Sequence, residues 1–152
     1  MQIDIYSGGE YPADVLSNFT PRTFVIDGVT CASMEGFLQS LKFLSPSTQK
    51  RVCMLSGKEA KKCGENKRLW KWSKRVCWQG RIIKRESQEF TLLLLRAYQE
   101  MYKADARFRQ ALEDAKGYTL CHSIGKRDKL QTILTEDEFI FCLEFLQSNG
   151  AE

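Results

Sequence analysis

The chain has 152 residues, of which 43% are hydrophobic and 28% charged, and its formal net charge is +4. This length is most simply one domain, residues 1–152, large enough to bury roughly two-thirds of its unfolded surface without a metal or a disulfide. The apolar run Thr91–Leu95 is too short to span a bilayer, and the N-terminus has no basic region or cleavage signal. We therefore expect a cytoplasmic protein without a membrane partner.

The first predicted elements are a strand over Gln2–Tyr6 and a hairpin over Thr23–Ala32 that turns at Asp27-Gly28. The chain after the hairpin is expected to be largely helical. Serine N-caps predict the starts of the next three helices, because a serine hydroxyl accepts from the free amides of a first helical turn. These are Ser33, with a helix from Met34, Ser45 followed by Pro46, and Ser56, whose helix ends at Gly64.

The second half of the chain is predicted to be built around a central buried helix over Ile82–Lys103. Its apolar residues recur at helical spacing: Phe90, Leu93, Leu94, Ala97 and Met101. A helix over Ala104–Ala115 and a short buried strand over Tyr118–His122 follow. A capping box at Thr135–Glu138 opens the last helix, which Asn149-Gly150 closes. The sequence therefore predicts a mainly helical α+β domain, with a small N-terminal β-hairpin or sheet packed on a helical core.

The six cysteines are spread along the chain without a Cys-x-x-Cys pair, and His122 is the only histidine. This spacing argues against a structural zinc site, and neither a metal nor a cofactor is predicted. In a chain without a secretory signal, we expect the cysteines to be reduced and largely buried as small apolar side chains.

An acid, an amide and an amine are placed on one face of the helix that begins at Met34. Glu35, Gln39 and Lys42 lie at spacings of four and three residues, which brings them together at 3.6 residues per turn. The ordinary interpretation is a solvated helix face with a ladder of polar side chains. The alternative is a site in which the three groups act on a ligand.

A longer pattern around these residues favours a site. Leu16-Ser17-Asn18-Phe19 precedes an aromatic strand that ends at Asp27-Gly28, and Ser33–Phe43 then reads Ser-x-Glu-x-x-x-Gln-x-x-Lys-Phe. This set closely resembles the YbiA-like, or NADAR, family of N-glycosidases. The resemblance resumes in Leu120–Asp128, Thr132–Thr135 and Glu138-Phe139, so that it covers most of the chain from Leu16 to Leu146.

The resemblance implies cleavage of a ribosyl C–N bond in a conjugate of ADP-ribose or ribose phosphate. Because this cleavage develops oxocarbenium character at C1, a carboxylate near the ribose can stabilise charge, orient water or exchange protons. Glu35 is the predicted catalytic carboxylate, and Lys42 is the second predicted catalytic residue. A desolvated neutral Lys42 amine could attack C1 to form an imine, whereas a charged one would pair with Glu35 or a substrate phosphate.

Substrate-binding roles are predicted for Ser17 and Asn18, in the turn of the Ser-Asn-Phe motif, and for Gln39. Asn18 would hold the ribose or a base edge, although asparagine in such a turn often bonds its own backbone. Gln39 would orient the Glu35 carboxylate or recognise the leaving base. Trp78 is predicted to stack on the base, with a core tryptophan as the alternative.

Three further substrate-binding positions follow from the second part of the resemblance. Gly125 would let the backbone approach a phosphate, and Asp128 would accept from a ribose hydroxyl. His122 belongs to this set, but its expected role is that of a buried histidine bonded to a backbone group.

Positive charge is concentrated in Lys58–Arg85, which holds eleven Lys and Arg against two acidic residues, a net charge of +9. Three tryptophans are interleaved with these cations, as phosphate contact and base stacking require. The alternative is a solvated basic helix with its tryptophans in the core. The predicted phosphate contacts are Lys67, Lys71, Lys74 and Arg75.

Members of the resembled family act on guanine bases that carry ADP-ribose as well as on small metabolites, and the basic segment favours the former. The resemblance therefore implies an N-glycosidase that removes ADP-ribose from guanine in nucleic acid, as an antidote to a DNA-modifying ADP-ribosyltransferase toxin. The expected partner is thus ADP-ribosylated nucleic acid or a small molecule like ADP-ribose. One alternative is hydrolysis of the ribose-phosphate amine intermediates of riboflavin synthesis. Another is a non-catalytic module that binds ADP-ribose or nucleic acid.

Overall fold

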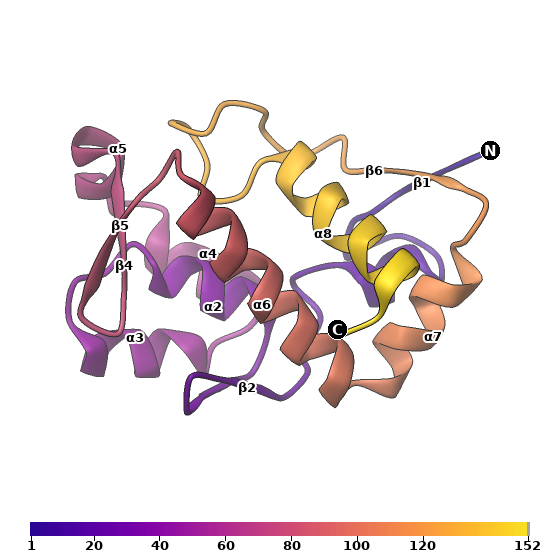
Figure 1. Ribbon diagram of the computed structural model, residues 1–152, viewed down its shortest axis with the longest axis horizontal. Helices are drawn as coiled ribbons and strands as arrows, with labels where there is room; N and C mark the ends of the chain where they lie inside the picture. Colours follow the sequence, from indigo (N-terminus) through magenta and orange to yellow (C-terminus); the bar gives the residue numbers. More distant parts are fainter. Residues whose placement is uncertain (152) are drawn as a thin grey trace.

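The computed structural model describes residues 1–151 and has short strands distributed among helices (Figure 1). The helices are α1 (Ala13–Leu16), α2 (Met34–Ser40), α3 (Pro46–Cys53), α4 (Gly57–Gly64), α5 (Leu69–Ser73), α6 (Gln88–Ala104), α7 (Ala106–Asp114) and α8 (Glu136–Asn149). The strands are β1 (Gln2–Asp4), β2 (Phe24–Ile26), β3 (Val29–Cys31), β4 (Arg75–Trp78), β5 (Arg81–Lys84) and β6 (Thr119–Cys121). Among the described residues they pair as β1 with β6, β2 with β3 and β4 with β5. The predicted α+β class is confirmed.

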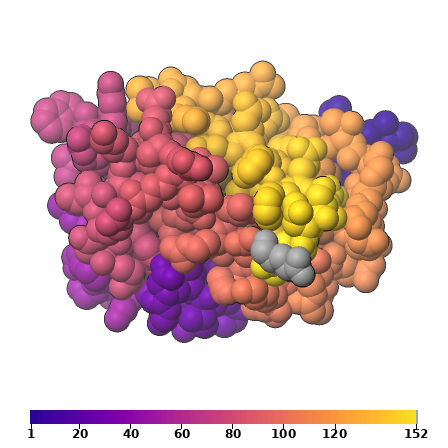
Figure 2. Space-filling view, in the orientation of Figure 1, coloured from indigo at the N-terminus to yellow at the C-terminus, as the bar shows by residue number. Residues whose placement is uncertain are grey.

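Helix α6 crosses the molecule between its two ends (Figure 1). One end carries α5 with the β4–β5 hairpin, and the other carries α7, β1 and β6. The apolar side of α6 is buried as its helical spacing predicts, and the helix contacts α2, α7 and α8. In the view of Figure 2, side chains of α6 and α8 adjoin on one face, with the loop before α8 along its upper edge.

The predicted start of α6 at Ile82 is wrong. Residues Arg81–Lys84 form β5, which pairs antiparallel with β4 across a turn at Gln79-Gly80. Both turn residues have positive φ, 50° and 82°, the geometry of a two-residue hairpin turn. The helix begins only after Ser87, whose hydroxyl accepts from the Phe90 amide at 3.2 Å. The apolar pattern therefore continues from strand into helix without marking the boundary.

Helix α2 begins where its N-cap predicts. The Ser33 hydroxyl accepts from the Gly36 amide at 2.9 Å and donates to the Leu55 carbonyl at 2.8 Å, which ties the start of α2 to the end of α3. The helices pack closely here, since a Cβ on Gly36 would lie only 2.5 Å from the Leu55 carbonyl oxygen. Helix α2 thus packs against both α3 and α4.

The two parts of the chain that are farthest apart meet at the parallel pair of β1 and β6. Gln2 pairs with Thr119, and the Asp4 carboxylate accepts from the Ser123 amide at 2.8 Å and from its hydroxyl at 2.5 Å. These bonds lower the pKa of Asp4. The predicted strand over Tyr118–His122 is confirmed, and the N-terminal strand fixes the start of the loop that leads to α8.

A buried ion pair holds the other end of this loop. Arg85 is 0% exposed, and its guanidinium donates to both carboxylate oxygens of Glu138 at 2.7 and 2.8 Å. It also donates to the Thr132 carbonyl at 3.0 Å and lies over the Phe90 ring. Glu138 in turn completes the predicted capping box with Thr135. Arg85, the last cation of the basic segment, is therefore a core residue.

Two further properties concern the chain as a whole. Four of the six cysteines are buried, as predicted: Cys31, Cys53, Cys77 and Cys142. Within residues 1–151, no helix combines the length and the apolar character needed to cross a membrane.

Candidate functional site

A cavity of about 280 Å³ lies beside α2 and contains the three polar residues singled out in the sequence, Glu35, Gln39 and Lys42. Its second wall is the turn over residues 17–19. The loop between β6 and α8 forms the third wall, with His122, Gly125 and residues up to 134. The polar stripe of α2 is therefore a pocket wall and not a solvated face.

Glu35 occupies a desolvated position in this pocket. Its Oε2 accepts from Gln39 Nε2 at 2.7 Å, one helical turn along. Burial raises the pKa of the Glu35 carboxyl above its ordinary value, although the Gln39 bond and the charge of Lys42 act in the opposite direction. Because its pKa is raised, this carboxyl keeps its proton to a higher pH than an ordinary glutamate and is suited to deliver it to a leaving group.

Lys42 follows the last turn of α2 and is partly buried. Its Nζ lies 3.4 Å from the Gly64 carbonyl oxygen and 5.7 Å from the centre of the Trp70 ring. Burial lowers the pKa of Lys42 to about 8, and Lys71 contributes in the same direction, while Glu35 opposes the shift. A substantial fraction of this amine is therefore neutral at mildly alkaline pH.

The segment that carries Lys42 is clamped by Gln49, a fully buried residue that the sequence analysis did not single out. Gln49 Nε2 lies within hydrogen-bond distance of the carbonyls of Cys77 (2.7 Å), Phe43 (3.0 Å) and Ser40 (3.2 Å). The side chain therefore satisfies carbonyls that the end of a helix leaves free. No local signal marks Gln49, because its partners lie at the end of α2, in the segment after it and on β4.

The Ser-Asn-Phe turn lies against the start of α2. The Asn18 carbonyl accepts from the Glu35 amide at 3.0 Å, and its Oδ1 accepts from the buried Tyr98 hydroxyl at 2.8 Å. The Asn18 amide nitrogen is thus the group of this side chain left to face a ligand. Ser17 also lines the pocket, but its hydroxyl accepts from the Phe19 amide and shapes the turn.

His122 has the predicted backbone partner. Its Nδ1 donates to the Ile5 carbonyl at 2.6 Å, which leaves Nε2 as the acceptor of the neutral ring. The ring packs edge-on against Phe139. Gly125 closes over it, since a Cβ there would lie 2.5 Å from His122 Cδ2. In this structure, Gly125 provides room for the histidine ring within the pocket wall.

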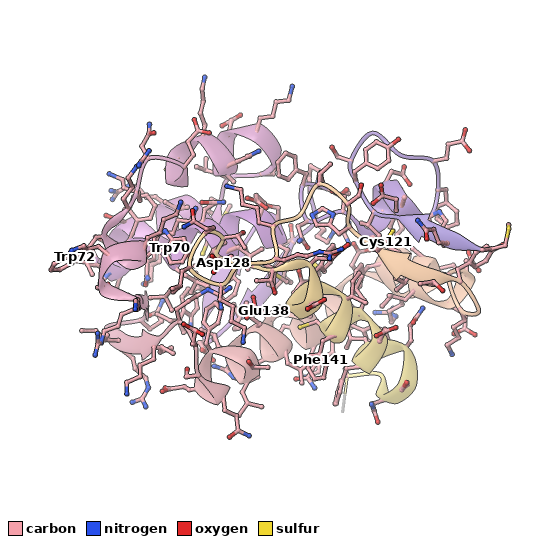
Figure 3. The ribbon with its side chains drawn as sticks, turned by 90° about the horizontal axis from the view of Figure 1, so that it is seen from above. Trp70, Trp72, Cys121, Asp128, Glu138 and Phe141 are labelled. Atoms are coloured by element: carbon pink, nitrogen blue, oxygen red, sulfur yellow. The ribbon has the colours of Figure 1, made fainter. Side chains whose placement is uncertain are left out.

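Two of the predicted substrate contacts lie outside the lining of this pocket. Trp78 is 4% exposed and belongs to the core, where it packs edge-on against Phe37 and donates from Nε1 to Asp27 at 2.7 Å. Asp128 lies on the loop leading to α8, outside the pocket lining, and its carboxylate accepts from the Leu130 amide (Figure 3). The aromatic residues that line the pocket are Tyr6 and Phe19.

The predicted phosphate contacts are divided by the structure. Lys71 lines the pocket, whereas Lys67, Lys74 and Arg75 are exposed outside it. The sequence analysis missed two further cations of the lining, Lys61 on α4 and Lys126 on the loop before α8. Lys126 belongs to the second part of the quoted motif, so its position in that motif was the available signal.

The lining offers oxygen and nitrogen groups but no metal-binding cluster. Among residues 1–151, no three His, Cys, Asp or Glu side chains gather closely enough to ligate a metal ion.

Residues 10–148 match the family model of the bacteriophage protein GP30.3. The chain belongs to the GP30.3 family. Over 149 residues it is 36% identical to the 17.1 kDa protein of the Gp30-rIII intergenic region of Enterobacteria phage T4. The alignment covers 97% of this chain and 98% of the phage T4 protein.

The fold of the GP30.3 family chain is that of a solved bacterial protein. The NMR structure of the Escherichia coli protein YbiA matches with a TM-score of 0.64 and 17% sequence identity. The match covers 97% of this chain and 85% of YbiA. The predicted resemblance to the YbiA-like family is therefore confirmed at the level of the fold.

Gly64 lies next to two residues of the pocket: its carbonyl oxygen is near Lys42 Nζ, and its Cα faces the Gln39 side chain that donates to Glu35. A substitution at Gly64 therefore tests the geometry of the site. A Cβ on Gly64 would lie 1.9 Å from Gln39 Oε1, so Gly64→Ala must displace the amide that donates to Glu35. We expect this variant to lose about 1–3 kcal/mol of stability through overpacking. Because the lost bond lowers the pKa of Glu35, that pKa should rise further in an NMR titration of the carboxyl group.

The control is a double-mutant cycle with Gln39→Ala, which removes the obstructing amide. In that background, Gly64→Ala should cost much less than in the wild-type protein. Equal costs in both backgrounds would show that the strain does not act through Gln39.

Proposed function

We propose that this protein is an N-glycosidase that hydrolyses a ribosyl C1–N bond. The observation that carries this proposal is the pairing, in one pocket, of a carboxyl with a raised pKa and an amine with a lowered one, Glu35 and Lys42. A protonated acid can assist departure of the base, and a neutral amine or an activated water can attack C1. The resemblance of the Ser-Asn-Phe and Ser33–Phe43 motifs to the YbiA-like family of N-glycosidases supports a reaction of this type, and the YbiA fold agrees with that resemblance.

Two roles for Lys42 fit this chemistry. In the first, its neutral amine attacks C1 as the C1–N bond breaks, and the leaving nitrogen takes the Glu35 proton. The attached amine then loses a proton, the ribose ring opens with protonation of its oxygen, and the imine that results is hydrolysed by water. In the second, Lys42 remains a cation that holds a substrate phosphate, while Glu35 assists attack by water.

For the substrate, we propose ADP-ribosylated guanine in nucleic acid. Lys61, Lys71 and Lys126 line the pocket, so phosphate groups would meet three cations there in addition to Lys42 when its amine is protonated. The cavity volume of about 280 Å³ suits a ribosyl group with its neighbouring substituent, and the remainder of a larger substrate would extend past the mouth. The partner implied is an ADP-ribosyltransferase that modifies guanine, whose effect this protein would reverse.

One assay separates the candidate substrates. The protein is incubated with DNA that carries ADP-ribosylated guanine and, separately, with the phosphorylated amine intermediate of riboflavin synthesis. We expect release of ADP-ribose from the DNA. Release of ribose phosphate from the intermediate alone would instead assign a metabolic hydrolase, and no release from either would favour a binding module.

Borohydride distinguishes the two roles of Lys42. If the imine forms, reduction during turnover should trap a covalent sugar adduct on Lys42, detectable by mass spectrometry of the digested protein. The yield should increase as pH rises through about 8, because the amine must lose its proton to attack. Lys42→Arg should give no adduct and little turnover. An active Lys42→Arg enzyme without a trapped species would leave the phosphate-binding role.

A further inference from the structure

Trp72 is 85% exposed, whereas the other two tryptophans of the basic segment, Trp70 and Trp78, are 2% and 4% exposed. All three lie within or next to the short elements α5 and β4. In Figure 3, Trp72 projects from the outer edge of the molecule, and Trp70 lies further in. The indole face of Trp72 is therefore accessible to a ligand, unlike the faces of Trp70 and Trp78.

Positive charge surrounds this ring. Eight cations lie on α4, on α5 and in the segments next to them, against the two carboxylates of Glu59 and Glu65. The cations are Lys58, Lys61, Lys62, Lys67, Arg68, Lys71, Lys74 and Arg75. Lys61 and Lys71 also line the candidate active-site pocket, so this basic surface is continuous with the pocket mouth. We call it the α4–α5 surface.

We propose that the α4–α5 surface binds single-stranded nucleic acid next to the target nucleotide, with Trp72 as the platform on which a flanking base stacks. The inference rests on the proposed function for the position of the target base in the pocket. Cations would track the phosphates, and the indole would present a face that any unpaired base can cover. In a duplex the bases are already stacked on one another, so an exposed ring favours a single strand.

The positive charge of the α4–α5 surface favours a nucleic acid over a protein as its ligand. Leu69 lies three residues before Trp72 on α5 and is 52% exposed, so an apolar partner would find two adjoining side chains there. Such a partner would also have to cover the surrounding lysines. A nucleic acid can do both, because its phosphates pair with the cations and its bases stack on the Trp72 ring.

The test uses unmodified DNA, so that it does not depend on catalysis. Binding is followed by fluorescence anisotropy of a labelled single-stranded oligothymidylate of about 12 nucleotides, within the range of known single-strand sites. Trp72→Ala should weaken binding about 5- to 150-fold, the loss of one stacked base, and Trp72→Phe should retain most of the affinity. The matched control is Phe141→Ala, which removes an exposed aromatic ring from α8 and should leave binding unchanged.

Salt dependence tests the cations of the same surface. Removing both Lys67 and Lys74 should reduce the slope of log affinity against log salt by about 1.4, which is about 0.7 for each phosphate contact with a single strand. Wild-type affinity in Trp72→Ala would overturn the proposal. It would also be overturned by equal affinity for a duplex of the same length, or by losses as large in Phe141→Ala.

The outcome is separable from that of the proposed function. Oligothymidylate binding that depends on Trp72, in a protein that releases no ADP-ribose, would retain the surface and reject the glycosidase. ADP-ribose release by a protein whose single-strand affinity does not depend on Trp72 would retain the glycosidase and reject the nucleic-acid surface.

Discussion

Replacing Glu35 with glutamine should lower turnover at saturating substrate by a factor of about 10² or more, while substrate binding changes by only a few-fold. Glutamine keeps the shape of the side chain but cannot give a proton to the leaving base or carry the charge that stabilises C1. The measurement is ADP-ribose release from modified DNA under single-turnover conditions, with substrate affinity determined separately.

Glu65→Gln is the control for this prediction. Glu65 lines the same pocket but is exposed, so Glu65→Gln removes a carboxyl group from the lining without removing the half-buried acid that contacts Gln39. Turnover in this variant should stay close to that of the wild-type protein. Near-normal turnover in folded Glu35→Gln would exclude Glu35 from the mechanism.

Breaking the buried pair of Arg85 and Glu138 should have the largest effect on stability. Arg85→Met or Glu138→Gln is expected to lower the free energy of unfolding by about 3–5 kcal/mol, because each leaves its partner's charge buried and unpaired. The double variant should lose less than the sum of the single changes. Chemical denaturation of the four proteins measures this coupling.

The chain provides a matched surface pair, Arg81 and Glu89, which are linked by an exposed ion pair. Arg81→Met with Glu89→Gln should change stability far less, since exposed pairs contribute little. Comparable losses at the two sites would contradict the argument that burial gives the Arg85 pair its importance.

The parts of the molecule that sequence reasoning recovered are those with local causes. Ser33 and Ser45 cap the helices that follow them, and the Asp27-Gly28 turn closes the β2–β3 hairpin with positive φ at both positions. Glu35, Gln39 and Lys42 met in one pocket because spacings of four and three residues bring them to the same side of α2 and of the turn that follows it. These features depend on a few neighbouring residues.

The predictions failed for residues whose position depends on a contact with a residue far away in the sequence. Trp78 is in the core because Phe37 and Asp27 receive it, and neither contact is visible from the basic segment in which it lies. Arg85 is buried because Glu138 lies 53 positions away to pair with it. The β4–β5 hairpin, which was not predicted, has a local signal in the Gln79-Gly80 turn. The apolar residues Ile82 and Ile83 instead fitted the helical spacing of the segment that follows.

The parallel pairing of β1 with β6 has a consequence for the order in which the protein acquires its pocket. Asp4 and Ser123, which bond across this pair, are separated by 119 positions. During synthesis from the N-terminus, β1 therefore has no native partner until most of the chain has emerged from the ribosome. Because contacts of such long range also slow folding, the wall that holds His122 and Gly125 should be among the last parts to form. A nascent chain stalled before residue 119 would thus carry Glu35 and Lys42 without a closed pocket around them.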